Sequence, residues 1–110
     1  MRTYLPKEPR REELELSSVL YALSDPIRLD IVRQLSSVDS LACGSFRIKK
    51  PKSSLSHHFR VLRESGVVAT RRDGTALLNR LRRQDLESKF PGLLKAVLGS
   101  LPKASRSTRS

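Results

Sequence analysis

Most of the side chains in this sequence that could do chemistry lie in residues 51–74, PKSSLSHHFRVLRESGVVATRRDG. At about 3.6 residues per turn, one side of a helix through the first half of this segment is apolar and carries Leu55, Phe59 and Leu62. The opposite side is polar and carries Ser53, Ser56, His57 and Arg60. Small polar, imidazole and guanidinium groups can enter a groove and hydrogen-bond to the edges of bases. The pattern therefore predicts a helix, at about 52–65, that reads nucleic acid.

The predicted helix has recognisable ends and is followed by a hairpin. Pro51 suits the start of a helix, where its missing N–H costs nothing, and Gly66 suits the left-handed position after the last turn. Residues 67–81 are rich in β-forming side chains on both sides of Asp73-Gly74, a pair that is typical of a tight hairpin. A helix followed by such a hairpin is the second half of a winged helix-turn-helix.

We expect eight side chains of this unit to contact DNA. They lie at the start of the helix, on its polar side and at the hairpin tip: Lys52, Ser53, Ser54, Ser56, His57, Arg60, Arg71 and Arg72. An arginine of the hairpin would enter a narrow minor groove. The alternatives are that His57 is a plain surface residue and that Arg71 and Arg72 only make the hairpin tip soluble. Three further arginines would meet phosphates or solvent: Arg80, Arg82 and Arg83.

The distribution of charge favours a polyanionic partner. The 110-residue chain has a formal net charge of +11. Residues 47–83 hold eleven Lys and Arg against two acidic residues, Glu64 and Asp73, which gives a net charge of +9. A run of charge is by itself more often a solvated surface, but this run coincides with the predicted helix and hairpin. The coincidence favours nucleic acid as the partner.

The rest of the chain is expected to position this unit within one domain, residues 12–101. Residues 1–11 are predicted to be a flexible arm, and residues 102–110 a disordered basic tail. Helices are predicted over three ranges, 12–23, 26–35 and 84–101, and Asp25 is predicted to cap the second of these. Residues 36–50 are predicted to hold one short helix that positions the reading helix.

The first and last predicted helices have more apolar side chains than a single small core requires. The last helix is interrupted by Pro91, which would kink or restart it. We expect these two helices to pack against each other and against a second copy of the chain. The apolar residues predicted to lie at this dimer interface are Leu16, Leu20, Phe90, Leu93, Leu94 and Val97.

Neither a metal, a cofactor nor a catalytic activity is expected from the remaining reactive side chains. We interpret the lone cysteine, Cys43, as a small buried apolar side chain. The alternative is that its thiol acts as a redox sensor. His57 and His58 are adjacent, so they point in different directions and cannot chelate one metal, and His58 is expected at the edge of the core. The sequence has no phosphate-binding loop, paired carboxylates or nucleophile–His–acid set. It has no apolar run for a membrane span or signal peptide, so a cytoplasmic protein is expected.

Three stretches together resemble the ArsR/SmtB family of small winged-helix bacterial regulators. They are LYALSDPIRLDIVRQL (20–35), KSSLSHHFRVLRESGVV (52–68) and TRRDG (70–74). The resemblance implies a mainly α winged helix-turn-helix with a β-hairpin wing and the order α-α-α-α-β-β-α. It also implies a homodimer formed by the terminal helices, and binding to a palindromic DNA operator. Proteins of this kind typically repress transcription and release DNA when an effector binds.

Two departures from that family bear on the effector. Many members sense metal through a Cys-x-Cys pair at the positioning helix, where this chain has only Cys43. Others place histidines and carboxylates along the last helix, but residues 84–101 contain neither His nor Cys. A small-molecule effector is possible, but the sequence identifies neither it nor the operator, and it leaves the sign of regulation open.

Two other functions compete with a sequence-specific regulator. A basic structural protein of the nucleoid or ribosome would account for the charge. It would not account for the polar side of the helix or for the apolar terminal helices. A winged helix that contacts only proteins is disfavoured by the block with a net charge of +9.

Overall fold

The computed structural model describes residues 7–102, so parts of the predicted arm (1–6) and tail (103–110) lie outside the described residues. Within it, the α-helices are α1 (Leu16–Ala22), α2 (Pro26–Leu35), α3 (Lys52–Ser65), α4 (Arg83–Lys89) and α5 (Leu93–Gly99). The strands are β1 (Leu41–Ala42), β2 (Val68–Asp73) and β3 (Ala76–Leu81). Two short 3₁₀ helices are η1 (Arg11–Glu13) and η2 (Cys43–Ser45).

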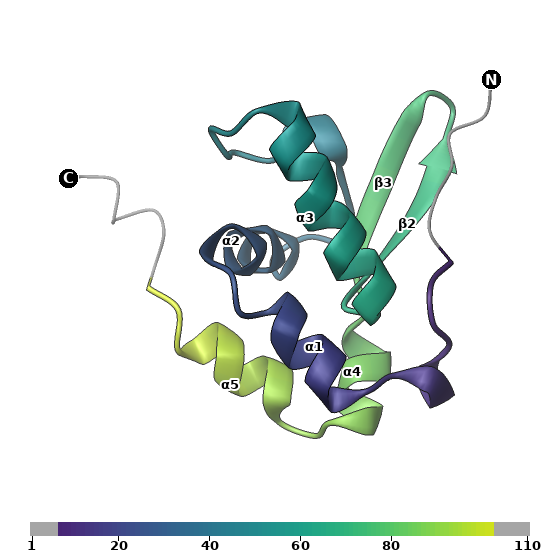
Figure 1. Cartoon of the computed structure of the whole chain (residues 1–110), viewed down its shortest axis with the longest axis vertical. Helices are drawn as coiled ribbons and strands as arrows, with labels where there is room; N and C mark the ends of the chain where they lie inside the picture. Colours follow the sequence, from purple (N-terminus) through teal and green to yellow (C-terminus); the bar gives the residue numbers. More distant parts are fainter. Residues whose placement is uncertain (1–6, 103–110) are drawn as a thin grey trace.

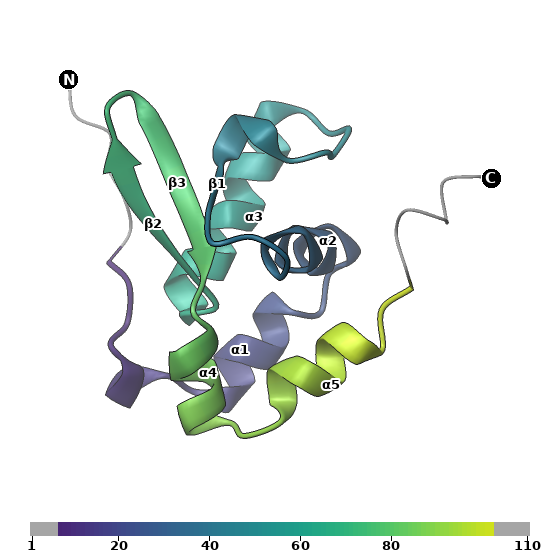
Figure 2. The same cartoon turned by 180° about the vertical axis from the view of Figure 1, so that it is seen from behind.

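The helices form a cluster with the β2–β3 hairpin standing at one side (Figure 1). Seen from behind, β1 runs beside β3 (Figure 2), and the antiparallel sheet has the order β1-β3-β2. The core is formed by apolar side chains from the helices α1 to α4 and from the hairpin, including Val19, Ile31, Leu35, Phe59, Leu62, Val67, Val68, Leu81 and Leu86. This arrangement is the predicted winged helix-turn-helix, with α3 as its second helix and the β2–β3 hairpin as its wing.

The predicted boundaries of α2 and α3 are confirmed. The Asp25 carboxylate accepts hydrogen bonds from the backbone N–H of Ile27 at 2.8 Å and of Arg28 at 3.1 Å, as an N-cap does. At the other end of the unit, Gly66 follows α3 with φ of 87°, in the left-handed conformation that favours glycine.

The predicted positioning helix within residues 36–50 is wrong as an α-helix. This range, which the structure describes throughout, holds the two-residue strand β1 and the 3₁₀ turn η2 instead. Leu41 and Ala42 pair with Asn79 and Leu78 of β3, so the backbone is extended where a helix would begin. Only three residues, Cys43–Ser45, then form a helical turn before the chain becomes extended again at Phe46. These residues are compatible with a helix, but they pair instead with β3, a strand more than thirty residues later in the sequence.

Two smaller predictions are corrected, and the predicted interruption of the last helix at Pro91 is confirmed. The first helix is divided into η1 and α1, because buried Leu14 lies in the extended stretch between them. The last helix is divided into α4 and α5 by Pro91 and by Gly92, which has φ of 82°. Asp73 pairs with Ala76, so the wing turn is Gly74-Thr75 rather than Asp73-Gly74. Since only the first of these two residues has positive φ, the turn has the pattern of type II′.

Residues 7–13, most of which were expected in a flexible arm, lie along the base of the wing and against α4 (Figure 1). The Glu8 carboxylate accepts a hydrogen bond from the Thr70 backbone N–H of β2 at 2.8 Å. The Pro9 carbonyl accepts one from the Arg82 guanidinium at 2.7 Å, and Arg11 donates to Asp85 at 2.8 Å. This segment therefore ties the wing to α4.

Three glycine-to-alanine variants separate backbone strain from steric fit. Gly66→Ala is expected to lower the free energy of unfolding by about 2–4 kcal/mol, because left-handed strain adds to a clash with Leu14. Gly92→Ala should cost only the strain, about 1–2 kcal/mol, since a Cβ there meets no described atom within 4 Å. Gly44→Ala, with neither feature, is the control. Urea denaturation measures all three, and equal losses would contradict this account.

Candidate nucleic-acid interface

The polar side of α3 faces outward, as its sequence predicts. Lys52, Ser53, Ser56, His57 and Arg60 are exposed, and Ser54 is half-buried. The opposite side is fixed by burial: Phe59 and Leu62 lie in the core, and the Phe46 ring packs edge-on against Phe59 at 5.1 Å between centroids. Because apolar contacts hold the inner side, the helix cannot rotate without exposing them. The outward side is thus a pre-oriented surface of hydroxyl, imidazole and guanidinium groups.

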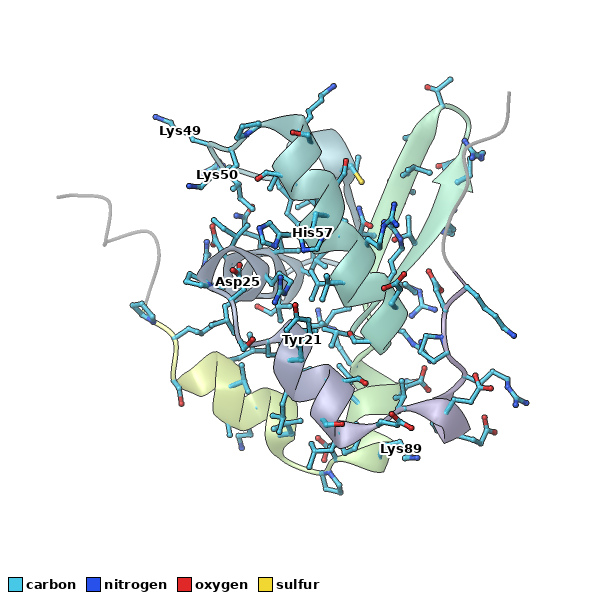
Figure 3. The ribbon with its side chains drawn as sticks, viewed as in Figure 1. Tyr21, Asp25, Lys49, Lys50, His57 and Lys89 are labelled. Carbon is cyan, nitrogen blue, oxygen red and sulfur yellow. The ribbon has the colours of Figure 1, made fainter. Side chains whose placement is uncertain are left out.

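Further cations surround the start of α3. Arg47, Lys49 and Lys50 are exposed in the preceding loop, and Lys49 and Lys50 point outward from it (Figure 3). On the wing, Arg71 and Arg72 are exposed and lie opposite Leu78 and Leu77 of β3. This distribution places positive charge at two sites that flank the outer side of α3.

Two arginines that were expected at phosphates or solvent are structural instead. Arg82 is only 7% exposed and donates to the Asp85 carboxylate at 3.0 and 2.8 Å. Hydrogen bonds from Arg11 and Arg82 hold the pKa of Asp85 below its usual value, although burial opposes this. Arg83 donates to three carbonyls at the end of α2 and beyond it, those of Leu35, Ser36 and Val38. Arg80 and Arg83 are both exposed, and Arg82 is buried.

His58 is half-buried at the edge of the core, as expected, and its Nδ1 lies 3.1 Å from a guanidinium nitrogen of Arg28. Sequence analysis did not single out Arg28 and missed its burial. In the structure Arg28 is 5% exposed and engages backbone carbonyls of α1. The residues next to Arg28 in the sequence do not indicate this burial, because its hydrogen-bond partners lie on two other helices, α1 and α3.

Cys43 is half-buried and its sulfur accepts a hydrogen bond from the Asn79 side-chain amide at 3.2 Å. Asn79 is fully buried in β3, where it also bonds the Leu41 carbonyl and the Thr70 hydroxyl. The sulfur therefore belongs to a polar contact that joins the start of η2 to the sheet. A redox role for this thiol stays untested.

Among residues 7–102, no three His, Cys, Asp or Glu side chains come together as a candidate metal site. Within the same range, no helix is both long enough and apolar enough to cross a membrane.

An apolar surface lies on α1 and α5, which lie side by side in both views (Figures 1 and 2). On α1, the exposed fractions are 47% for Leu16, 45% for Leu20 and 60% for Tyr21. The predicted interface residues of the C-terminal part are half-buried against the core: Phe90, Leu93, Leu94 and Val97. The structure thus gathers the six predicted interface residues on the two terminal helical segments.

Comparison with known proteins identifies the family. Residues 25–70 match the model of bacterial regulatory proteins of the arsR family. The HTH-type transcriptional regulator YceK of Bacillus subtilis is 36% identical over 84 residues, which cover 74% of this chain and 84% of that protein. The arsenical resistance operon repressor of Staphylococcus xylosus is 37% identical over 76 residues, covering 66% of this chain and 71% of that one.

A solved structure agrees with these sequence matches. The transcriptional repressor BigR from Xylella fastidiosa superposes with a TM-score of 0.63 at 31% identity, over 80% of this chain and 87% of that one. The range matched by the family model, residues 25–70, includes α2 and α3 and ends in β2. The chain therefore belongs to the arsR family and is a DNA-binding transcriptional regulator of that type.

Proposed function

We propose that this regulator binds a palindromic operator as a homodimer and represses transcription from it. In this proposal α3 enters the major groove, and the wing rests on the flanking backbone or minor groove. The observation that carries the proposal is the fixed outward orientation of the polar side of α3, which the burial of Phe59 and Leu62 enforces. Repression is supported by relatives that are themselves named repressors.

The eight candidate contacts divide into two chemical classes. Ser53, Ser56, His57 and Arg60 carry donors and acceptors suited to base edges, whereas Lys52 and the wing arginines suit phosphates or a narrow minor groove. Ser54, half-buried beside them, would approach the backbone. The exposed loop cations Lys49 and Lys50 extend the phosphate-binding class toward the start of α3.

A second copy is proposed to cover the apolar surface of α1 and α5. Exposed leucines on α1 leave that surface accessible to water in the single chain. Burying it in a symmetric interface would stabilise both copies. Two-fold symmetry would then present two α3 helices to half-sites whose centres lie about 34 Å apart. The protein would act in the compartment that holds the chromosome, the cytoplasm.

The reading role of α3 is tested by His57→Ala and Arg60→Ala. Each is expected to cost about 1–3 kcal/mol of binding free energy on a duplex selected by the wild-type protein from a random pool. On random-sequence DNA each should cost little, because base contacts carry the specificity. The measurement is the affinity for both duplexes. If both affinities fall equally, α3 does not read the sequence.

Replacing a wing arginine should weaken DNA binding in a different way. Arg71→Ala is expected to weaken binding to the selected and random duplexes together, and to reduce the slope of log affinity against log salt by about one unit. Thr75→Ala, at the exposed wing turn, is the matched control and should preserve the slope. A salt series gives the slopes. A loss confined to the selected duplex would show that Arg71 reads bases instead.

The dimer is tested by placing a charge on the α1 surface. Leu20→Glu, at a position that is 45% exposed in the single chain, should leave the fold intact and shift the protein from dimer to monomer. Val38→Glu, an exposed apolar position outside the proposed interface, is the control and should stay dimeric. Light scattering at tens of micromolar reports the mass. A monomeric wild-type protein under these conditions would refute the dimer.

A further inference from the structure

One guanidinium connects the three helices on which DNA reading depends. Arg28, on α2, donates to the Ala22 carbonyl at 2.8 Å and to the Tyr21 carbonyl at 3.2 Å, both at the end of α1. Its guanidinium carbon lies 5.1 Å from the centre of the Tyr21 ring. Its remaining terminal nitrogen lies 3.1 Å from Nδ1 of His58, on α3. Tyr21 and Asp25, labelled in Figure 3, mark this junction.

The contact with Arg28 determines which nitrogen of the His58 ring carries the proton. A guanidinium has donors only, so Nδ1 of His58 must accept this hydrogen bond and the ring proton must lie on Nε2. A ring that carries both protons has no acceptor and cannot make the contact. The Arg28–His58 bond therefore exists only while the imidazole is neutral.

We propose that Arg28 and His58 are positioning residues for DNA reading, which hold α3 in its reading orientation on α1 only while the His58 ring accepts the Arg28 hydrogen bond. This proposal rests on the proposed reading role of α3. His57 and Arg60 lie within two residues of His58 on the same helix, so a shift at His58 moves them directly. Sub-ångström displacement of such groups is enough to impair hydrogen bonds to base edges.

A second partner is available to the protonated ring. Asp25 Oδ2 lies 3.7 Å from Nδ1 of His58, while it caps α2 through the N–H groups of Ile27 and Arg28. A protonated Nδ1 would be repelled by Arg28 and attracted to Asp25. The ring would then exchange Arg28, which is anchored on α1, for the cap of α2, and the hydrogen-bonded link from α3 through Arg28 to α1 would be lost.

The pKa of His58 lies below its usual value, and burial is the largest cause. Burial lowers the pKa of His58, and Arg28 on α2, His57 on α3 and Lys50 in the preceding loop lower it further, against the opposing effect of Asp25. A histidine whose pKa is depressed on folding contributes stability that is complete above its unfolded value of about 6.5. That contribution declines as the pH falls below this value toward the folded pKa.

Acidification is expected to change DNA recognition in the direction opposite to the one that simple electrostatics predicts. Protonating a histidine beside DNA adds positive charge and would by itself strengthen binding to phosphates. Under the proposal, acidification instead lowers the preference for the selected duplex over random DNA. We expect a decrease of about tenfold or more once the pH, lowered from about 8, has passed below the folded pKa of His58, the scale of one lost hydrogen bond to a charged group.

The test measures this preference across the pH range for the wild type and three variants, with circular dichroism as a check of folding at each pH. His58→Asn retains an acceptor near the Nδ1 position but does not titrate, so it should keep the preference at neutral pH and lose less of it on acidification. His58→Leu should show a reduced preference at every pH. His57→Asn removes a proposed base contact and so should start from a lower preference, but it should still show the acid-dependent fold decrease.

Two outcomes would overturn the proposal: His58→Asn losing as much preference in acid as the wild type, or folded His58→Leu matching the wild type at every pH. Both leave the reading role of α3 intact, because that role is judged from His57→Ala and Arg60→Ala at neutral pH. A wild-type protein without any preference for its selected duplex would instead refute the proposed function, and this proposal with it.

Discussion

The burial of Phe59 and Leu62 on the inner side of α3 is the constraint on which the rest of the structure depends. Phe59 is 4% exposed and Leu62 is inaccessible to solvent. Because those two side chains face the core, the polar side chains of Ser56, His57 and Arg60 face outward. The remaining helices and the sheet supply the apolar platform on which this one helix can rest. The outward polar surface of α3 is therefore a consequence of packing on the opposite side.

The strong positive charge of the chain is divided between two tasks. Arg28 and Arg82 are buried and bind backbone carbonyls or a carboxylate, so they hold elements together. Arg63 is also buried, and burial lowers the pKa of its guanidinium. Arg60, one turn earlier on α3, is exposed. Net charge alone thus overstates the number of cations available to DNA, and burial is needed to separate the two groups.

Features with local causes could be predicted from the sequence. The Asp25 cap, the Gly66 helix end and the outward side of α3 each depend on residues within a few positions of one another. The missed features depend on distant partners. The β1 strand forms because β3 lies beside it, and Arg83 reaches carbonyls of residues 35–38. The Arg28–His58 contact likewise joins two helices that are separated by the η2 region, so helical periodicity could not reveal it.

The contact between Glu8 and the Thr70 backbone N–H has a consequence for the colloidal behaviour of the protein. β2 lies at one edge of the sheet, and an open edge is a template for pairing with strands of other molecules. The Glu8 carboxylate occupies the edge N–H of Thr70, and the two residues after Thr70 in β2 are exposed arginines, so this pairing is blocked. The strand at the opposite edge, β1, has only two residues. Removing the segment before η1 would uncover the edge and favour edge-to-edge aggregation during concentration and storage.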